Sequence, residues 1–154
     1  MTERFAEHGT FTIERVYPAA PARVFRAWAD PAAKARWFVG PNTAWKETYR
    51  AFDFRVGGSE RVTGGPPGEP AHSFDARYWD IVPDERIVYA YEMHIGDTRI
   101  SVSLATVEFK PSGGGTRLVF TEQAVFLDGY DDAGSRERGT KVLLDQLGAA
   151  LQAS

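Results

Sequence analysis

At 154 residues the chain is long enough for one domain whose hydrophobic core needs neither a disulfide nor a metal to hold it together. It has no cysteine, which excludes disulfides, thiolate zinc sites and cysteine nucleophiles. Its net charge is −3, and acidic and basic residues are interspersed along the chain, so no nucleic-acid partner is expected. The N-terminus lacks the basic and apolar runs of a signal peptide, and no segment approaches the roughly 20 apolar residues of a membrane span. We therefore expect a cytoplasmic protein that does not insert into membranes.

The N-terminal part of the chain predicts one strand and then two short helices. Residues 11–17 (FTIERVY) alternate loosely between apolar and polar side chains, as a half-buried strand does. Pro21 suits the first turn of a helix, and three apolar residues fall on one face of that helix, namely Val24, Phe25 and Trp28. Asp30 followed by Pro31 predicts a second helix with a side-chain cap, which should end at about 36–38.

About six strands are predicted between Trp45 and Phe126. Short segments rich in Val, Ile, Tyr, Phe and Thr alternate with glycine and proline turns, a spacing typical of an antiparallel meander. The clearest pair joins Ile100–Phe109 to Thr116–Val125 across KPSGGG, so this glycine-rich stretch is expected to be a turn and not a phosphate-binding loop. Two glycine pairs are candidate bend or bulge sites, Gly57-Gly58 and Gly64-Gly65.

The pattern becomes helical after DGYDDAG (128–134). A helix of about 20 residues, roughly 30 Å long, would cross a whole sheet. Its apolar stripe consists of Thr140, Leu143, Leu144, Leu147 and Leu151, and we place Arg136, Lys141, Asp145 and Gln152 off that stripe. One long helix on an antiparallel sheet gives an α+β fold of two layers. If the sheet curves around the helix, the space between them becomes a cavity.

Four stretches, in chain order, resemble a known family: RVYPAAPARVFRAWADPAAKARWF, FDFRVGGSERV, RYWDIVPDERIVYAYE and GGGTRLVFTEQAVF. They are similar to the Activator of Hsp90 ATPase homologue 1-like proteins, within the START/Bet v 1-like (SRPBCC) superfamily. The similarity runs from about Thr10 to Leu151, so residues 1–154 are expected to be a single START/Bet v 1-like domain. The resemblance implies a helix-grip fold, in which a curved antiparallel seven-stranded sheet wraps a long C-terminal helix and two short helices follow strand 1.

Function follows less firmly from this resemblance than the fold does, because the superfamily includes carriers of hydrophobic ligands, polyketide cyclases and co-chaperone domains. We expect a monomer or homodimer that uses no cofactor and binds a small hydrophobic or amphipathic molecule between sheet and helix. One alternative is an enzyme of the cyclase or lyase type, acting on a polyketide-like or aromatic ligand through a cavity Glu, Tyr or His. The other is an interaction module with a chaperone partner, like the Hsp90 co-chaperones.

The expected cavity lining combines aromatic residues of the short helices with inward-facing residues of the strands and the long helix. It comprises Trp28, Trp37, Phe38, Tyr78, Tyr89, Tyr91, Phe109, Phe120, Glu122, Thr140 and Leu144. Trp28, Trp37 and Phe38 also fit a structural role as core or cavity-rim residues, because bulky aromatic side chains usually serve packing. The chain also departs from many relatives, whose long helix starts with Gly-Trp, because it has Gly139-Thr140 at this point. The smaller threonine favours an open cavity beside the helix, whereas a helical Gly139 is typical of close packing or a bend.

Glu122 is the candidate catalytic residue. It shares a strand face with Leu118 and Phe120, so it should point toward the long helix, where a carboxylate facing an apolar cavity can act as a general acid or base or orient a polar ligand. The alternative is that the strand is ending, so that Glu122 lies in water at the mouth of the cavity or pairs with an arginine.

Other titratable residues give weaker indications. The three histidines, His8, His72 and His94, lack metal-ligand spacing, so no metal site is expected, and the common phosphate, dinucleotide and nucleophile-elbow motifs are missing from the sequence. Glu92 and His94 lie on the strand face opposite Tyr89 and Tyr91. They are exposed if the tyrosines face inward, and an acid–base pair inside the cavity if they do not. Arg55 either adds a polar group to the lining or pairs with Asp53 or a loop carbonyl.

Overall fold

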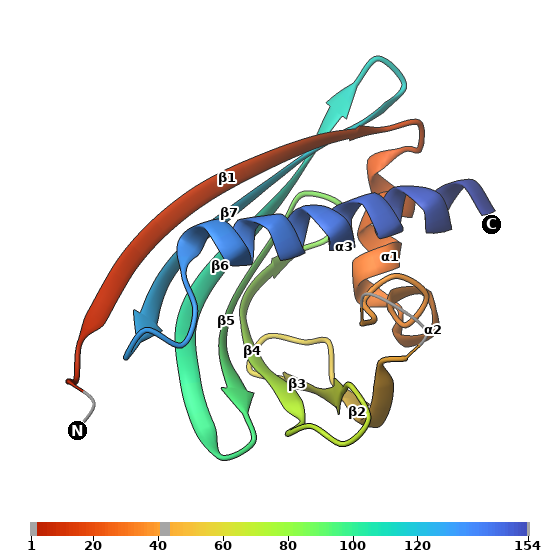
Figure 1. Ribbon diagram of the computed structural model, residues 1–154. Coiled ribbons are helices and arrows are strands. Elements are labelled where there is room, and N and C mark those ends of the chain that lie inside the picture. The colour runs from red at the N-terminus through yellow and green to blue at the C-terminus, as the bar shows by residue number, and fades with distance from the viewer. Residues whose placement is uncertain (1–2, 41–43, 154) are drawn as a thin grey trace.

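The computed structural model describes residues 3–40 and 44–153. Its elements follow the predicted order, with one strand, two short helices, six strands and a long helix. They are β1 (Ala6–Tyr17), α1 (Pro21–Ala29), α2 (Pro31–Lys34), β2 (Lys46–Phe52), β3 (Ser59–Gly65), β4 (His72–Val82), β5 (Arg86–Ile95), β6 (Thr98–Ser112), β7 (Gly115–Leu127) and α3 (Ala133–Ala153). Figure 1 shows a strongly curved sheet with α3 crossing its concave face and α1 and α2 at one end.

All seven strands form one antiparallel sheet in the order β1-β7-β6-β5-β4-β3-β2. Strands β2 to β7 are a simple meander, whereas β1 pairs with β7 at the far edge. The two short helices therefore carry the chain from one edge of the sheet to the other. This arrangement confirms the predicted helix-grip fold.

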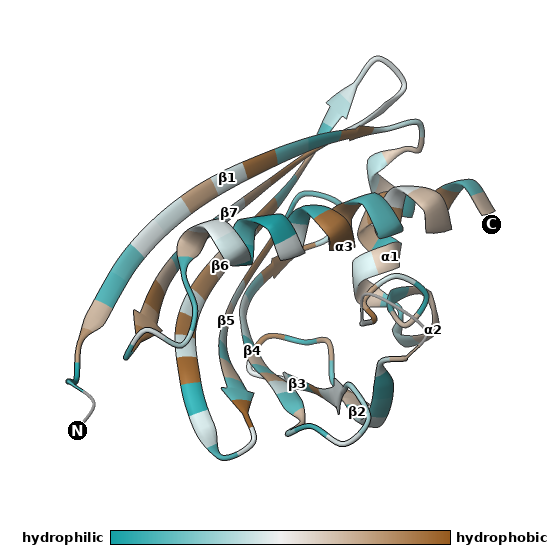
Figure 2. Ribbon diagram, viewed as in Figure 1, coloured by the Kyte–Doolittle hydropathy of each residue, from teal (hydrophilic) through white to brown (hydrophobic). Residues whose placement is uncertain are grey.

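The long strands carry alternating apolar and polar side chains, visible as bands in Figure 2, and this alternation decides which face of each strand is buried. On β7, Leu118, Phe120 and Glu122 are buried on the concave side, as their spacing predicts. The hairpin between β6 and β7 pairs Phe109 with Leu118, and its glycine turn has positive φ at Gly113 and Gly114. The KPSGGG stretch thus joins two strands, as predicted: residues 110–112 end β6, Gly113 and Gly114 make the turn, and Gly115 begins β7.

Several element boundaries differ from the sequence-based expectation: β6 and β7 are longer than predicted at both ends, and β1 and α2 differ as well. Strand β1 begins at Ala6, five residues early, because its polar start still pairs in register with the end of β7, from Ala6 against Leu127 onward. Backbone hydrogen bonds, not burial, extend this strand. Helix α2 ends at Lys34, before the expected 36–38, although its cap is as predicted: the Asp30 carboxylate accepts the Ala33 N–H at 2.8 Å.

Only one of the two predicted glycine bend sites lies in a strand. Gly64 faces the register shift of β2 between Glu47 and Tyr49, and a Cβ there would come within 2.7 Å of the Lys46 carbonyl oxygen. The close approach of two backbones therefore requires glycine at this bulge. The prediction for Gly57-Gly58 was wrong, because both residues belong to the turn between β2 and β3.

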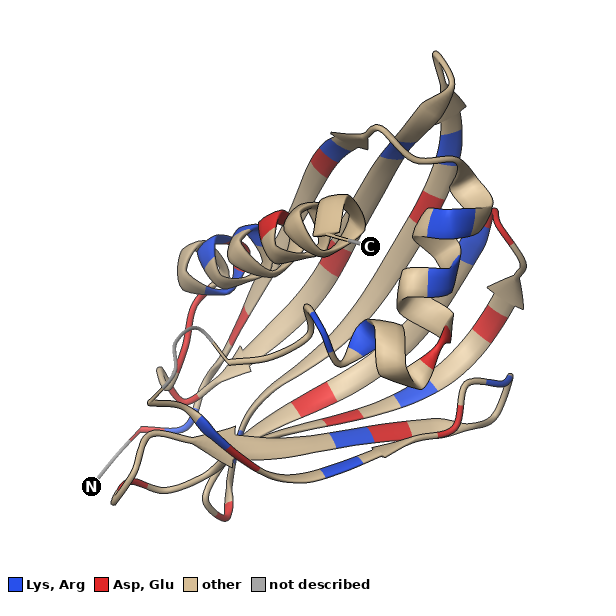
Figure 3. Cartoon of the chain, turned by 90° about the vertical axis from the view of Figure 1, so that its right-hand side faces the viewer, with Lys and Arg blue, Asp and Glu red and all other residues tan. Residues whose placement is uncertain are grey.

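Helix α3 lies against the sheet through the predicted stripe, of which Thr140, Leu144, Leu147 and Leu151 are buried. The hydroxyl of Tyr17 at the end of β1 donates to the Leu144 carbonyl at 2.7 Å, which ties the middle of the helix to the sheet edge. Basic and acidic residues are interspersed over strands and helices (Figure 3). Within the described ranges, no helix combines the length and apolar character needed to cross a membrane.

Candidate functional site

A cavity of about 360 Å³ lies between α3 and the concave face of the sheet. Its walls are mainly aromatic and aliphatic side chains from α1, α3, the segment between α2 and β2, and strands β3, β4, β5 and β7, and β2 contributes Glu47. Glu122 and Arg136 are the charged residues deepest in this lining, whereas Val39, Glu47 and Val142 are exposed, so the cavity reaches solvent beside them. The volume and apolar character are those of ordinary small-molecule sites.

The polar wall of the cavity is built around the Glu122 carboxylate. Glu122 is fully buried, and its Oε2 atom accepts hydrogen bonds from the Tyr91 hydroxyl at 2.7 Å and the Ser103 hydroxyl at 2.8 Å. The Nη1 atom of Arg136, on the first turn of α3, lies 3.3 Å from the same oxygen and donates to the Tyr91 hydroxyl at 2.9 Å. Three elements thus place donors around one carboxylate oxygen.

The guanidinium of Arg136 is held on its other side as well. Its Nη2 atom donates to the Ser101 hydroxyl at 2.7 Å and to the Asp131 carboxylate at 3.1 Å. Burial alone would lower the pKa of Arg136, but Tyr91, Glu122 and Asp131 outweigh it and raise that pKa, so the group stays charged. Burial, and then the Glu122 charge, raise the pKa of Tyr91, which keeps its hydroxyl protonated as a donor.

Nine of the eleven residues expected to line the cavity do so: Trp28, Trp37, Phe38, Tyr89, Tyr91, Phe120, Glu122, Thr140 and Leu144. Phe109 lies outside the lining, because its ring packs edge-on against Phe25 and Trp28 behind the cavity wall. Tyr78 also lies outside, since its hydroxyl belongs to a second buried cluster, described below. The expectation that Glu122 lies in water at the mouth was wrong, because β7 continues to Leu127 and buries it; the expected pairing with an arginine is present.

Open space lies beside the first turns of α3, as the Gly139-Thr140 pair predicts. A Cβ on Gly139 would meet no atom within 4 Å, so neither close packing nor crowding requires glycine there. Thr140 is buried on the cavity wall, with its hydroxyl donating to the Arg136 carbonyl at 3.0 Å. The expectation of close packing at Gly139 was therefore wrong, whereas the expectation of open space beside Gly139 and Thr140 agrees with the structure.

A second charged cluster is buried under α2. Lys34 Nζ donates to Glu60 Oε1 at 2.6 Å and to the Tyr78 hydroxyl at 3.1 Å, and Tyr78 donates to the same oxygen at 2.6 Å. Burial lowers the pKa of Lys34, and the Glu60 carboxylate offsets only part of that effect. None of the three lines the cavity. The cluster anchors α2 to β3 and β4.

The segment after α2 is fixed from several directions. Trp37 Nε1 donates to the Ala27 carbonyl at 2.9 Å, and the Trp37 carbonyl accepts from Gln146 of α3 at 2.7 Å. The carbonyl of Phe38 accepts from Arg50 of β2 at 2.7 Å. The aromatic wall formed by Trp37 and Phe38 is thereby hydrogen-bonded to α1, to α3 and to strand β2.

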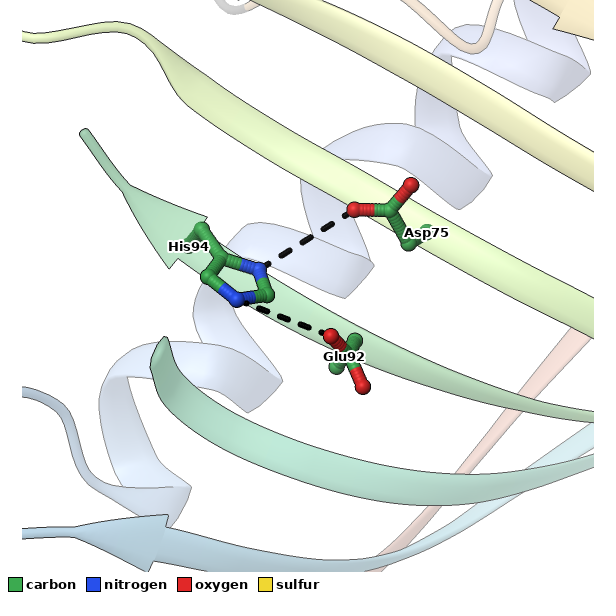
Figure 4. Close-up of side chains that lie close together, drawn as sticks. All are labelled: Asp75, Glu92 and His94. Carbon is green, nitrogen blue, oxygen red and sulfur yellow. Dashed lines mark ion pairs between the residues drawn. The ribbon is translucent and has the colours of Figure 1, made fainter. Parts of the chain in front are cut away.

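Glu92 and His94 lie on the convex face, because Tyr89 and Tyr91 point inward. Figure 4 shows His94 between two carboxylates, with Nε2 3.5 Å from Glu92 and Nδ1 4.0 Å from Asp75. These side chains are close enough to share one cation, but Arg61 and Arg99 already lie against Asp75 and Glu92. The inside alternative for this acid–base pair was therefore wrong. Arg55 pairs with Asp53 at 2.9 Å, as one of its alternatives predicted.

Sequence reasoning missed Arg136, because it was placed off the apolar stripe, and it did not single out the other members of the cluster, Ser101, Ser103 and Asp131. Arg136 precedes Thr140 by four residues, so one helical turn puts both on the same face. The helical period alone identifies position 136 as lying on the buried face, but the charge of Arg136 led to its placement on the solvent-facing side. Lys34 was missed in the same way, three residues before Trp37.

Residues 18–152 match the family model described as Activator of Hsp90 ATPase homolog 1-like protein. The chain belongs to this family. A solved structure of an uncharacterized protein from Rhizobium leguminosarum is 51% identical, with a TM-score of 0.93 over 99% of this chain and 100% of that one. The structure of protein Mll3558 from Rhizobium loti is 50% identical, with a TM-score of 0.88 over 95% of this chain and 99% of that one. The structure of protein CV1439 from Chromobacterium violaceum is 28% identical, with a TM-score of 0.79 over 92% of this chain and 96% of that one. The comparison with curated proteins found no match.

Proposed function

We propose that this member of the Activator of Hsp90 ATPase homolog 1-like family binds a small hydrophobic or amphipathic molecule between α3 and the sheet. The observation that carries the proposal is the cavity of about 360 Å³, whose mainly apolar wall holds a charged cluster in which Arg136 pairs with Glu122 and Asp131. Apolar pockets with a few convergent polar groups are the usual form of ligand sites. The open space beside Gly139 and Thr140 supports the same reading.

The proposal is tested first by native mass spectrometry of freshly purified protein, which detects a retained molecule by its added mass. Titration with the neutral fluorescent probe N-phenyl-1-naphthylamine then measures cavity binding directly. Thr140→Trp places an indole into the cavity and should abolish the probe signal. Lys141→Trp, the same substitution at the next and solvent-exposed position, is the matched control and should bind as wild type does. Equal binding by both variants would place the probe elsewhere and contradict the proposal.

A proton-transfer enzyme is the second candidate, because Glu122 and Tyr91 converge inside the cavity and, among the described residues, donors bond to only one of the two carboxylate oxygens. The other oxygen can accept a proton from a bound aromatic or polyketide-like ligand. Deuterium exchange into the methyl group of acetophenone, followed by NMR, tests this role. Exchange that is equally fast with wild type and with Glu122→Gln would exclude Glu122 as the base.

An interaction with a chaperone remains a prediction, which rests on the description of the family as activators of the Hsp90 ATPase. Stimulation of the ATPase activity of purified Hsp90 by this protein would support it, and the lack of any change at saturating protein would count against it.

A further inference from the structure

The cavity wall contains two buried polar atoms that have no hydrogen-bond partner among the described residues, the acceptor Glu122 Oε1 and the donor Trp28 Nε1. Both side chains line the cavity. They come from neighbouring parts of its wall, because the Trp28 ring stacks on Phe120, with centroids 6.5 Å apart, and Glu122 follows two residues later on the same face of β7. Buried polar atoms are normally hydrogen-bonded, so each such atom requires an explanation.

The two carboxylate oxygens of Glu122 have different surroundings. Oε2 is enclosed by the donors of Tyr91, Ser103 and Arg136. Oε1 accepts no hydrogen bond from the described residues, although the Glu122 side chain lines the cavity. An ionised carboxylate only accepts hydrogen bonds, and an indole N–H only donates them. The two unpartnered atoms therefore call for one donor and one acceptor.

Arg136 is not free to hold an anionic ligand. Its two terminal nitrogens already contact Tyr91, Glu122, Ser101 and Asp131. Two carboxylates and one guanidinium leave the cluster with a local charge of −1. A ligand carboxylate would meet this excess negative charge and would find no unused cation in the cluster, so its burial would be unfavourable.

We infer that the molecule bound here is neutral and apolar, with a hydroxyl as its polar group. A hydroxyl donates one hydrogen bond and accepts others, so it suits both unpartnered atoms. The inference rests on the proposed ligand-binding function and narrows the class of ligand. It assigns Glu122 Oε1 as the atom that selects alcohols and phenols over ethers and carboxylates of equal size.

Four probes of nearly equal length separate these chemistries: 1-decanol, its isomer 1-methoxynonane, decanoate and decane. Binding is followed at neutral pH by tryptophan fluorescence, because Trp28, Trp37 and Trp45 all line the cavity. The background variant Trp79→Phe removes the remaining tryptophan, which is exposed on β4 and does not line it. The expected result is that 1-decanol binds about tenfold to a hundredfold more tightly than 1-methoxynonane, the value of one hydrogen bond to a charged acceptor.

A variant ties this preference to one atom. In Glu122→Gln, the amide oxygen faces the donors of Tyr91, Ser103 and Arg136, so the amide nitrogen takes the place of Oε1 and presents a donor to the cavity. Alcohol and ether oxygens can both accept from it, and the ratio of their affinities should fall to about one. Glu92→Gln, the same change on the convex face, is the matched control and should keep the wild-type ratio.

Each outcome separates this inference from the proposed function. Equal binding of 1-decanol and 1-methoxynonane to the unsubstituted cavity would overturn the inference and leave the cavity a ligand site. Tightest binding of decanoate would also overturn it, because Arg136 would then be available to anions. If none of the four probes binds, the proposed function fails together with the inference. The comparison of probes on the wild-type cavity decides the matter even if Glu122→Gln does not fold.

Discussion

Replacing Arg136 with methionine tests whether the Glu122 cluster is as buried and as tightly coupled as its geometry indicates. The guanidinium lies 3.3 Å from Glu122 Oε2, and this separation corresponds to an attraction of about 5 kcal/mol at an effective dielectric constant of about 20. Removing one partner of a buried ion pair costs about 3–5 kcal/mol, because the other charge stays buried without compensation. Arg136→Met should therefore lose about 3–5 kcal/mol out of a total stability of about 5–15 kcal/mol.

Urea denaturation at neutral pH, followed by circular dichroism, measures this loss directly. Arg117→Met, which breaks the solvent-exposed pair of Arg117 with Glu14, is the matched control and should cost at most about 1 kcal/mol. Adding Glu122→Gln to Arg136→Met should recover part of the loss, because the uncompensated charge is then removed. A loss below about 1 kcal/mol for Arg136→Met, equal to the control, would refute the reasoning.

Three further predictions concern other groups. Lys34→Met should lower the free energy of unfolding in urea by about 3–5 kcal/mol, because Glu60 is left buried and unpaired; no loss would mean that Glu60 reaches water. Burial raises the pKa of four tyrosines, Tyr17, Tyr78, Tyr89 and Tyr91, so the stability that their protonated hydroxyls provide is complete below about pH 10 and is lost as the pH rises further. These tyrosines should ionise, as measured by ultraviolet absorbance, only together with unfolding. Ionisation without any change in circular dichroism would contradict this prediction. His94→Gln should change neither probe binding nor stability by more than about 0.5 kcal/mol, and weaker probe binding would give the convex face a part in function.

The fold could be predicted from the sequence because its signals are local and repeated. Alternation along β7 places Leu118, Phe120 and Glu122 on one face, and the helical period of α3 aligns Thr140 with Leu144 and Leu147. The closure of the sheet around the helix came from the resemblance to a family. No local pattern determines that β1 crosses over to pair with β7.

The candidate site was predicted only in part, because its chemistry depends on contacts between distant elements. The aromatic walls follow from burial, which sequence patterns indicate well. The pairing of Glu122 with Arg136 could not be predicted from the burial pattern, because a charged residue on a helix normally lies on the solvent-facing side. The same reasoning hid Lys34, whose partner Glu60 lies on a strand 26 residues away in sequence.

The attachment of Trp37 and Phe38 to three neighbouring elements has a consequence for how a ligand would be received. Because this wall is bonded through Trp37 to Ala27 and Gln146, and through Phe38 to Arg50, we expect it to keep its shape when the cavity is filled. Little conformational entropy is then lost from this side of the cavity on binding, and affinity depends mainly on how well the incoming molecule fits. If a ligand binds there as proposed, we expect the cavity to select molecules by their shape and polarity and not to adapt to each of them.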